Sequence, residues 1–171
     1  MTVMVLQPFH LTFMLLAALL LVSAAYFDAR SFRIPNWVWM GLLALFPLYV
    51  LSAQQEIEWL HHVGVFAVVL GIGFILFAGN FAGAGDVKML AAIALWAGPN
   101  FIGVLLVITA FAGGLLALGY ATAAYVRLRV QPQLAPTEGM MQVLGKTAIP
   151  YGVAIACGGL TSLGMMAAAL F

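Results

Sequence analysis

Residues 9–27 read FHLTFMLLAALLLVSAAYF and contain no Asp, Glu, Lys or Arg. A helix needs roughly 20 apolar residues to cross a bilayer, because each residue rises about 1.5 Å and the hydrocarbon core is about 30 Å thick. The stretch is therefore long and apolar enough to span a membrane. The whole chain has this character, since 65% of its 171 residues are apolar or aromatic and only 6% are charged. This composition excludes a water-soluble fold and favours an all-α integral membrane protein.

Further apolar stretches predict six transmembrane helices in a single polytopic domain over residues 1–171. The expected helices cover residues of about 9–27, 36–52, 63–78, 87–97, 101–126 and 148–171. The fourth helix differs from the others, because about 11 residues are too few to span a bilayer. It follows the glycine-rich segment Gly83-Ala84-Gly85-Asp86. We therefore expect a broken, short fourth helix after a GAGD segment that also lies at membrane depth.

The basic residues indicate how the chain is oriented. With six crossings, every Lys and Arg falls on one side of the membrane: Arg30, Arg33, Lys88, Arg127, Arg129 and Lys146. The opposite side receives residues 54–58 and 98–100, which contain no Lys or Arg. The positive-inside rule then places the basic loops in the cytoplasm.

The composition also limits the partners and cofactors. A net charge of +1 with scattered basic residues does not build a nucleic-acid interface, so we expect membrane lipid and no nucleic acid as surroundings. Cys157 is the single cysteine, so the chain forms no internal disulfide and no multi-cysteine zinc site. We expect neither a metal nor a cofactor. The sequence carries no signal for an oligomeric state.

Two aspartates are the strongest candidates for chemistry. Asp28 follows the first apolar stretch and Asp86 ends the glycine-rich segment, so the topology puts both on the same face at similar depth. Ionisable groups at membrane depth are expensive and mark functional sites. Two neighbouring carboxyl groups can share a proton, so that the ionised one activates a water while the protonated one donates to a carbonyl. This is the chemistry of aspartic peptidases.

Each aspartate also has a purely structural interpretation. Asp28 could pair with Arg30 or Arg33 at the membrane interface, and Asp86 could cap the fourth helix. Gly83 and Gly85 could simply break the helix, or could allow extended backbone close to a substrate strand.

Three further residues also have structural interpretations. Lys88 could act on the aspartates or contact substrate, or it could be an ordinary positive-inside anchor. Pro35 most simply starts the second helix, with Asn36 in the same first turn.

Three motifs resemble the type IV prepilin leader peptidase family. They are Asp28-Ala29-Arg30-Ser31-Phe32-Arg33-Ile34-Pro35-Asn36, Gly83-Ala84-Gly85-Asp86-Val87-Lys88 and Lys146-Thr147-Ala148-Ile149-Pro150-Tyr151-Gly152. The resemblance implies a GxGD-type aspartic endopeptidase of the bacterial inner membrane. Such an enzyme cuts pilin or pilin-like precursors after a short, basic leader at the cytoplasmic face.

The same resemblance implies roles for individual residues. Asp28 and Asp86 would be catalytic, and Gly83, Gly85, Lys88, Pro35 and Asn36 would support the site or lie close to substrate. The match is nearest to the short, peptidase-only branch associated with tight-adherence Flp pili. The chain has no CxxC motif of the kind carried by longer members that also methylate the new pilin terminus, so we do not expect methyl transfer.

Two rival functions come from other classes of protein. A small proton- or cation-coupled transporter or channel would use Asp28 and Asp86 as binding groups and the glycine-rich segment as a discontinuous helix. It would also be expected to show inverted-repeat symmetry, which the sequence lacks. A noncatalytic protein of pilus assembly would leave both aspartates replaceable.

Overall fold

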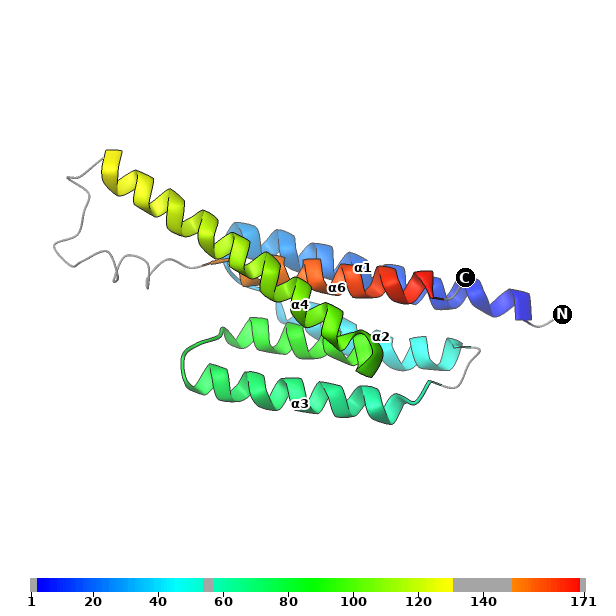
Figure 1. Cartoon of the computed structure of the whole chain (residues 1–171). Coiled ribbons are helices and arrows are strands. Elements are labelled where there is room, and N and C mark those ends of the chain that lie inside the picture. Colours follow the sequence, from blue (N-terminus) through cyan, green and yellow to red (C-terminus); the bar gives the residue numbers. More distant parts are fainter. Residues whose placement is uncertain (1–2, 54–56, 131–148, 170–171) are drawn as a thin grey trace.

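A computed structural model describes residues 3–53, 57–130 and 149–169 of the chain (Figure 1). The regular structure in these ranges consists of helices: α1 (Val3–Ser31), α2 (Asn36–Ser52), α3 (Trp59–Ala78), α4 (Ala84–Val130) and α6 (Tyr151–Ala168). Within these described ranges, four segments are long and apolar enough to cross a membrane: His10–Ser31, Trp59–Ala78, Ala84–Val126 and Tyr151–Ala168. The all-α membrane class is therefore supported, whereas six separate spans are not confirmed.

The helix bounds differ from the sequence expectation mainly at the helix starts. α2 begins and ends where the sequence predicted, whereas α3 begins at Trp59 rather than near residue 63. α1 continues to Ser31 and so includes Asp28 in its last turn. Residues 54–56, Lys146 and both ends of the expected last helix, 148 and 170–171, lie outside the described residues.

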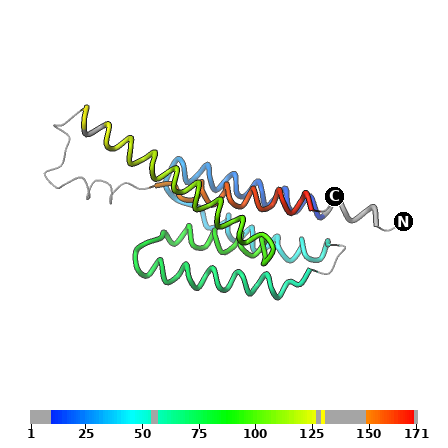
Figure 2. Tube along the Cα trace, viewed as in Figure 1, coloured from blue at the N-terminus to red at the C-terminus, as the bar shows by residue number. Residues whose placement is uncertain are grey.

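The expected short fourth helix corresponds to the first part of α4, residues 84–97, because Gly98 separates this part from a second helix. α4 begins at Ala84 and continues beyond residues 98–100, where the sequence predicted a loop. Gly98 interrupts it with φ 57° and ψ −170°, and Pro99 follows. Glycine adopts positive φ readily and proline lacks the N–H that a continuous helix requires, so the helix bends sharply here. The chain doubles back at this kink (Figure 2). We call residues 84–97 the first segment of α4 and residues 99–130 the second segment.

His62 of α3 stabilises the kink. In a continuous helix the carbonyl of Leu95 would accept a hydrogen bond from residue 99, but Pro99 has no N–H to donate. The Nδ1 atom of His62 lies 2.8 Å from the Leu95 carbonyl oxygen. The imidazole ring also fills the space where a side chain on Gly98 would lie. A ring nitrogen from another helix thus replaces the missing backbone donor.

The core lies where α1, α2, the first segment of α4 and α6 meet. Its largest fully buried side chains include Trp96, Leu21, Leu42 and Ile93. The indole N–H of Trp96 donates a 3.0 Å hydrogen bond to the carbonyl of Leu42, so its polar group is satisfied inside this core. α3 lies outside it, and its apolar side chains, such as Phe74 and Ile75, are mostly exposed, as suits a helix that faces lipid.

The helix order brings distant parts of the sequence to one end of the bundle. The end of α1 and the starts of α2, α4 and α6 all lie at this end, which we call the aspartate end (Figure 1). The start of α1 and the end of α6 lie at the opposite end. The first two motifs and the described residues 149–152 of the third therefore meet at the aspartate end.

Candidate active site

Asp28 links α1 to the beginning of α6. Its side chain is buried, with only 4% of the residue exposed. The backbone amide of Gly152 donates a 2.6 Å hydrogen bond to Oδ2 of Asp28, and the amide of Val153 also hydrogen bonds with this carboxyl group. Pro150, at the N-cap of α6, provides no side-chain cap. Since the first amides of a helix need acceptors and its N-terminus favours an anion, Asp28 acts as the cap of α6.

The alternative pairing of Asp28 with a neighbouring arginine is not the contact that the structure shows. The guanidinium carbon of Arg30 lies 5.4 Å from the centroid of the Tyr26 ring, and Arg33 is exposed. The burial of Asp28 is therefore explained by α6 and not by an ion pair with either arginine.

Asp86 occupies the first turn of α4, directly after the glycines. The helix begins at Ala84, and the amide of Val87 donates a 3.1 Å hydrogen bond to the carbonyl of Gly83. The Asp86 carboxyl group hydrogen bonds with the backbone of Gly83, so it caps its own helix, as the structural interpretation expected. Asp86 is half-buried. It therefore remains accessible from the aspartate end.

The two aspartates belong to one site. The carboxyl groups of Asp28 and Asp86 are near enough to interact electrostatically, although they come from α1 and α4. Each also lies at the N-terminus of a helix, α6 for Asp28 and α4 for Asp86. The arrangement thus provides two neighbouring carboxyl groups, one buried and one half-buried, which the catalytic prediction requires. Their catalytic role stays a prediction.

Ile34 packs between the two helix starts. A Cβ atom on Gly152 would lie 2.7 Å from Cδ1 of Ile34 and 2.8 Å from Oδ2 of Asp28, so no larger residue fits without a shift. On the other side, a Cβ atom on Gly85 would lie 3.6 Å from Cβ of Ile34. Ile34 therefore contacts the beginnings of α4 and α6 and helps to hold both aspartates in place.

Asn36 and Lys88 both contact Trp39. Pro35 is the N-cap of α2 and Asn36 is its first residue, so the proline directly precedes the helix that it was expected to start. The indole N–H of Trp39 donates a 3.2 Å hydrogen bond to Oδ1 of Asn36. The ammonium nitrogen of Lys88 lies 5.3 Å from the centroid of the Trp39 ring, a cation–π contact. The contact that Lys88 of α4 makes here is therefore with Trp39 of α2 and not with an aspartate.

The two glycines before Asp86 lie on either side of the start of α4. Gly83 precedes the helix and Gly85 is in its first turn, and Gly98 is the one glycine with positive φ among the described residues. Of the two alternatives for these glycines, extended backbone is not what the structure shows at Gly85, because Asp86 and Gly83 together cap a helix that begins at Ala84. The glycines differ in the space around them. A Cβ atom on Gly83 would lie 2.8 Å from Oδ2 of Asp86, whereas one on Gly85 meets only ordinary contact with Ile34.

Sequence reasoning missed the roles of Ile34 and Gly152. Both were inside motifs that it quoted, the Ile34-Pro35-Asn36 run and the Pro150-Tyr151-Gly152 run. The available signal was the position of a glycine two residues after the proline that starts a helix, where a backbone amide of the first turn can bind an anion. Nothing local indicated that the anion would be Asp28.

A protein metal site would need several ligand side chains close together. Nowhere in residues 3–53, 57–130 and 149–169 do three His, Cys, Asp or Glu side chains cluster as a metal site would need. Two adjacent carboxyl groups can carry out general acid and base catalysis on a peptide bond without a further group.

Comparison with known families identifies the class of protein. A family model described as the type IV leader peptidase family matches residues 14–118, more than half of the chain. The chain belongs to this family, which implies a protease. The matched region includes both aspartates and the kink of α4. No curated protein matches the chain, and no solved structure does.

Proposed function

We propose that this protein is a prepilin peptidase, an aspartic endopeptidase that removes the short basic leader from pilin or pilin-like precursors. The observation that carries the proposal is the placement of Asp28 and Asp86 in one site at the ends of α1 and α4. Membership of the leader peptidase family supports the substrate class. The proposal needs no cofactor.

The reaction follows from two neighbouring carboxyl groups in different protonation states. The ionised carboxylate takes a proton from a water, whose oxygen attacks the carbonyl carbon of the scissile peptide bond. The protonated carboxyl group donates to the carbonyl oxygen, which gives a tetrahedral intermediate. As the C–N bond breaks, the carboxyl group that took the water proton gives it to the departing nitrogen, and one hydroxyl of the intermediate returns its proton to the other carboxylate. A carboxylic acid and an amine are released, and both aspartates regain their starting protonation states. Binding at helix N-termini holds both carboxyl groups in position during these steps.

We place the reaction at the cytoplasmic face of the bacterial inner membrane. Arg30, Arg33 and Lys88 belong to the helix ends and turns at the aspartate end, and the positive-inside rule assigns such an end to the cytoplasm. A basic leader would be retained on that side by the same rule. It would also be attracted to the anionic leaflet, by about 1 kcal/mol for each Lys or Arg near the surface.

The structure weakens the main argument for a transporter. That alternative used the glycine-rich segment as a discontinuous helix beside Asp86, but α4 begins there. The interruption of α4 is at Gly98, directly after the first segment and therefore at the end of that segment that is distant from Asp86. A noncatalytic protein of pilus assembly would tolerate replacement of both aspartates, whereas a peptidase would not. One experiment therefore separates the two functions.

The test is cleavage of pilin precursors from the same genome by the purified protein in liposomes, with product masses as the readout. We expect wild type to release a leader, and Asp28→Asn, Asp86→Asn and the double variant to lose cleavage to a similar extent, because members of one catalytic unit are strongly non-additive. Glu58→Gln is the matched control, since Glu58 is an exposed acid at the opposite end. Near-normal cleavage by either single Asp variant would contradict the assignment.

A further inference from the structure

The second segment of α4 and α6 are tightly packed at one point and separate toward the aspartate end. At Gly158 of α6, an added Cβ atom would lie 2.6 Å from the carbonyl oxygen of Leu105 of α4, and it would also overlap Thr109. Nearer the aspartate end the two helices diverge (Figure 1). A groove with a volume of about 490 Å³ lies between them, within the size range of about 300–1,000 Å³ that is typical of ligand sites.

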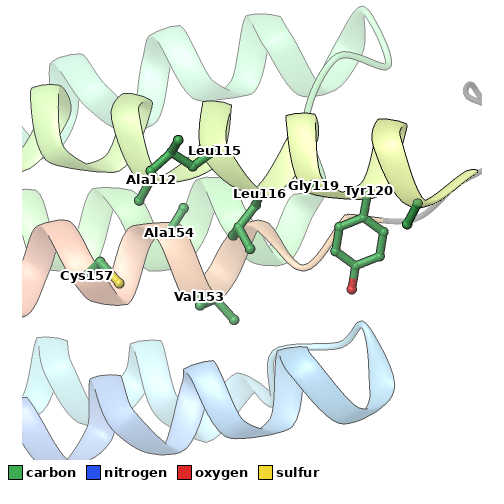
Figure 3. A pocket seen from close by; sticks show the side chains of 9 residues that line it. Ala112, Leu115, Leu116, Gly119, Tyr120, Val153, Ala154 and Cys157 are labelled. Carbon is green, nitrogen blue, oxygen red and sulfur yellow. The ribbon is translucent and has the colours of Figure 1, made fainter. Parts of the chain in front are cut away.

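The groove is apolar and elongated. Its walls are the side of α4 from Ala112 to Ala123 and the side of α6 formed by Val153, Ala154 and Cys157. Figure 3 shows Leu116 of α4 and Ala154 of α6 pointing toward the gap between the two helices. The α4 wall is about 16 Å long at about 1.5 Å per residue, which corresponds to about three turns of a helix lying along it.

Small residues make the walls of the groove suitable for a second backbone. Ala112, Gly119, Ala123 and Ala154 are spread along it, and a Cβ atom on Gly119 would meet nothing within 4 Å. In lipid, small residues of this kind let helices approach closely, and this close packing drives helix association.

Val153 links the groove to the candidate active site. This residue lines the groove, and its backbone amide hydrogen bonds with Asp28. The preceding amide, that of Gly152, donates to Oδ2 of the same carboxyl group. One end of the groove therefore lies beside the amides that hold the Asp28 carboxyl group.

We propose that this groove binds the apolar helix of the precursor, the segment that follows its leader. The inference rests on the proposed function, because a peptidase that cuts before an apolar helix must hold that helix beside its carboxyl groups. With the helix in the groove, the scissile bond lies at the end of the groove, next to Asp28. The groove thus selects precursors by their apolar segment, while the aspartates carry out hydrolysis.

Two glycines of the same helix provide a matched test. Gly119 lines the groove and Gly114 does not, both are exposed, and neither has an atom within 4 Å of an added Cβ. Five residues separate them, so they point about 140° apart around α4. Gly119→Leu fills the groove, and Gly114→Leu adds the same side chain to a different face.

We expect Gly119→Leu to lower kcat/KM for the full precursor in liposomes by at least about tenfold. It should leave the cleavage of a peptide without the apolar helix unchanged, and Gly114→Leu should cleave both substrates as wild type does. Equal rates for the two variants on the full precursor would overturn the groove assignment while leaving the peptidase assignment standing. Failure of wild type to cut any precursor would overturn both.

Cys157 provides a direct measurement of the contact, because this exposed side chain lines the groove and is the single cysteine of the chain. In an Asp86→Asn background, precursors with one cysteine at successive positions of the apolar helix are oxidised in liposomes. Crosslinks that recur every three or four residues, and that Cys157→Ala removes, would support the proposal. The absence of crosslinks at every position, or crosslinks without this period, would contradict it, as expected if lipid alone fills the groove.

Discussion

The backbone amide of Gly152 donates a 2.6 Å hydrogen bond to Oδ2 of Asp28, between residues 124 positions apart in the chain. This bond joins the end of α1 to the start of α6. It also occupies one carboxyl oxygen of Asp28, and the amide of Val153 hydrogen bonds with the same carboxyl group. The geometry of Asp28 therefore depends on a residue that has no side chain.

Gly152→Ala tests this dependence. The new Cβ atom would lie 2.8 Å from Oδ2 of Asp28 and 2.7 Å from Cδ1 of Ile34, so the carboxyl group must move. We expect kcat for precursor cleavage to fall by about a hundredfold, with KM little changed, because a displacement of about 1 Å is enough for such a loss. Gly164→Ala is the control, since this exposed glycine of α6 has open space around it. Equal losses in the two variants would show that Gly152 has no special role.

The glycines before Asp86 should respond differently to the same substitution. In Gly83→Ala the Cβ atom would lie 2.8 Å from Oδ2 of Asp86, so the carboxyl group turns away and cleavage falls. In Gly85→Ala the Cβ atom lies 3.6 Å from Ile34, an ordinary contact, so cleavage stays close to wild type. Initial rates of precursor cleavage at equal protein concentration measure the difference. The opposite order of the two variants would contradict this description of the site.

His62 should contribute to stability rather than to the reaction. His62→Ala leaves the Leu95 carbonyl without its 2.8 Å partner and opens a space beside Gly98. We expect the free energy of unfolding in detergent to fall by about 1–3 kcal/mol, the usual cost of an unsatisfied buried acceptor. His61→Ala should have little effect, because His61 is exposed and pairs with exposed Glu58. The result fails to support the role of His62 if both variants unfold alike.

Cysteine accessibility tests the orientation of the aspartate end. In a Cys157→Ala background, Ser31→Cys is at the end of α1 and Glu58→Cys is just before the start of α3, at opposite ends of the bundle. A membrane-impermeant thiol reagent should label Glu58→Cys in intact cells, and Ser31→Cys only after the inner face is exposed. Labelling of Ser31→Cys in intact, sealed cells would reverse the topology and remove the basis for a cytoplasmic site.

The sequence was informative where local patterns determine structure. The apolar stretch after Asn36 predicted both ends of α2, and the spacing of Asp28 and Asp86 relative to apolar stretches predicted that both belong to one end of the bundle. The sequence also predicted the boundary at residues 98–100, where Gly98 interrupts α4. It could not predict that His62, a side chain from α3, replaces a backbone donor at this boundary.

The rest of the site depends on contacts between distant segments. The packing of Ile34 against Gly85 and Gly152 requires the starts of α2, α4 and α6 to meet. The periodicity of the sequence does not indicate how far apart these three helix starts lie in space. The start of α4 was misplaced for a related reason. Glycine disfavours a helix, but here the Asp86 carboxyl group supplies a cap and the helix begins at Ala84 rather than near residue 87.

The capping of α6 by Asp28 constrains how this protein can evolve. A descendant that no longer needed hydrolysis could replace Asp86 at the cost of a local cap, since that carboxyl group contacts the start of its own helix. Loss of Asp28 would also leave the first amides of α6 without their acceptor, inside a buried region. Natural selection for stability and selection for activity therefore act on the same carboxyl group. An inactive lineage would be expected to lose the acid of α4 before the acid of α1.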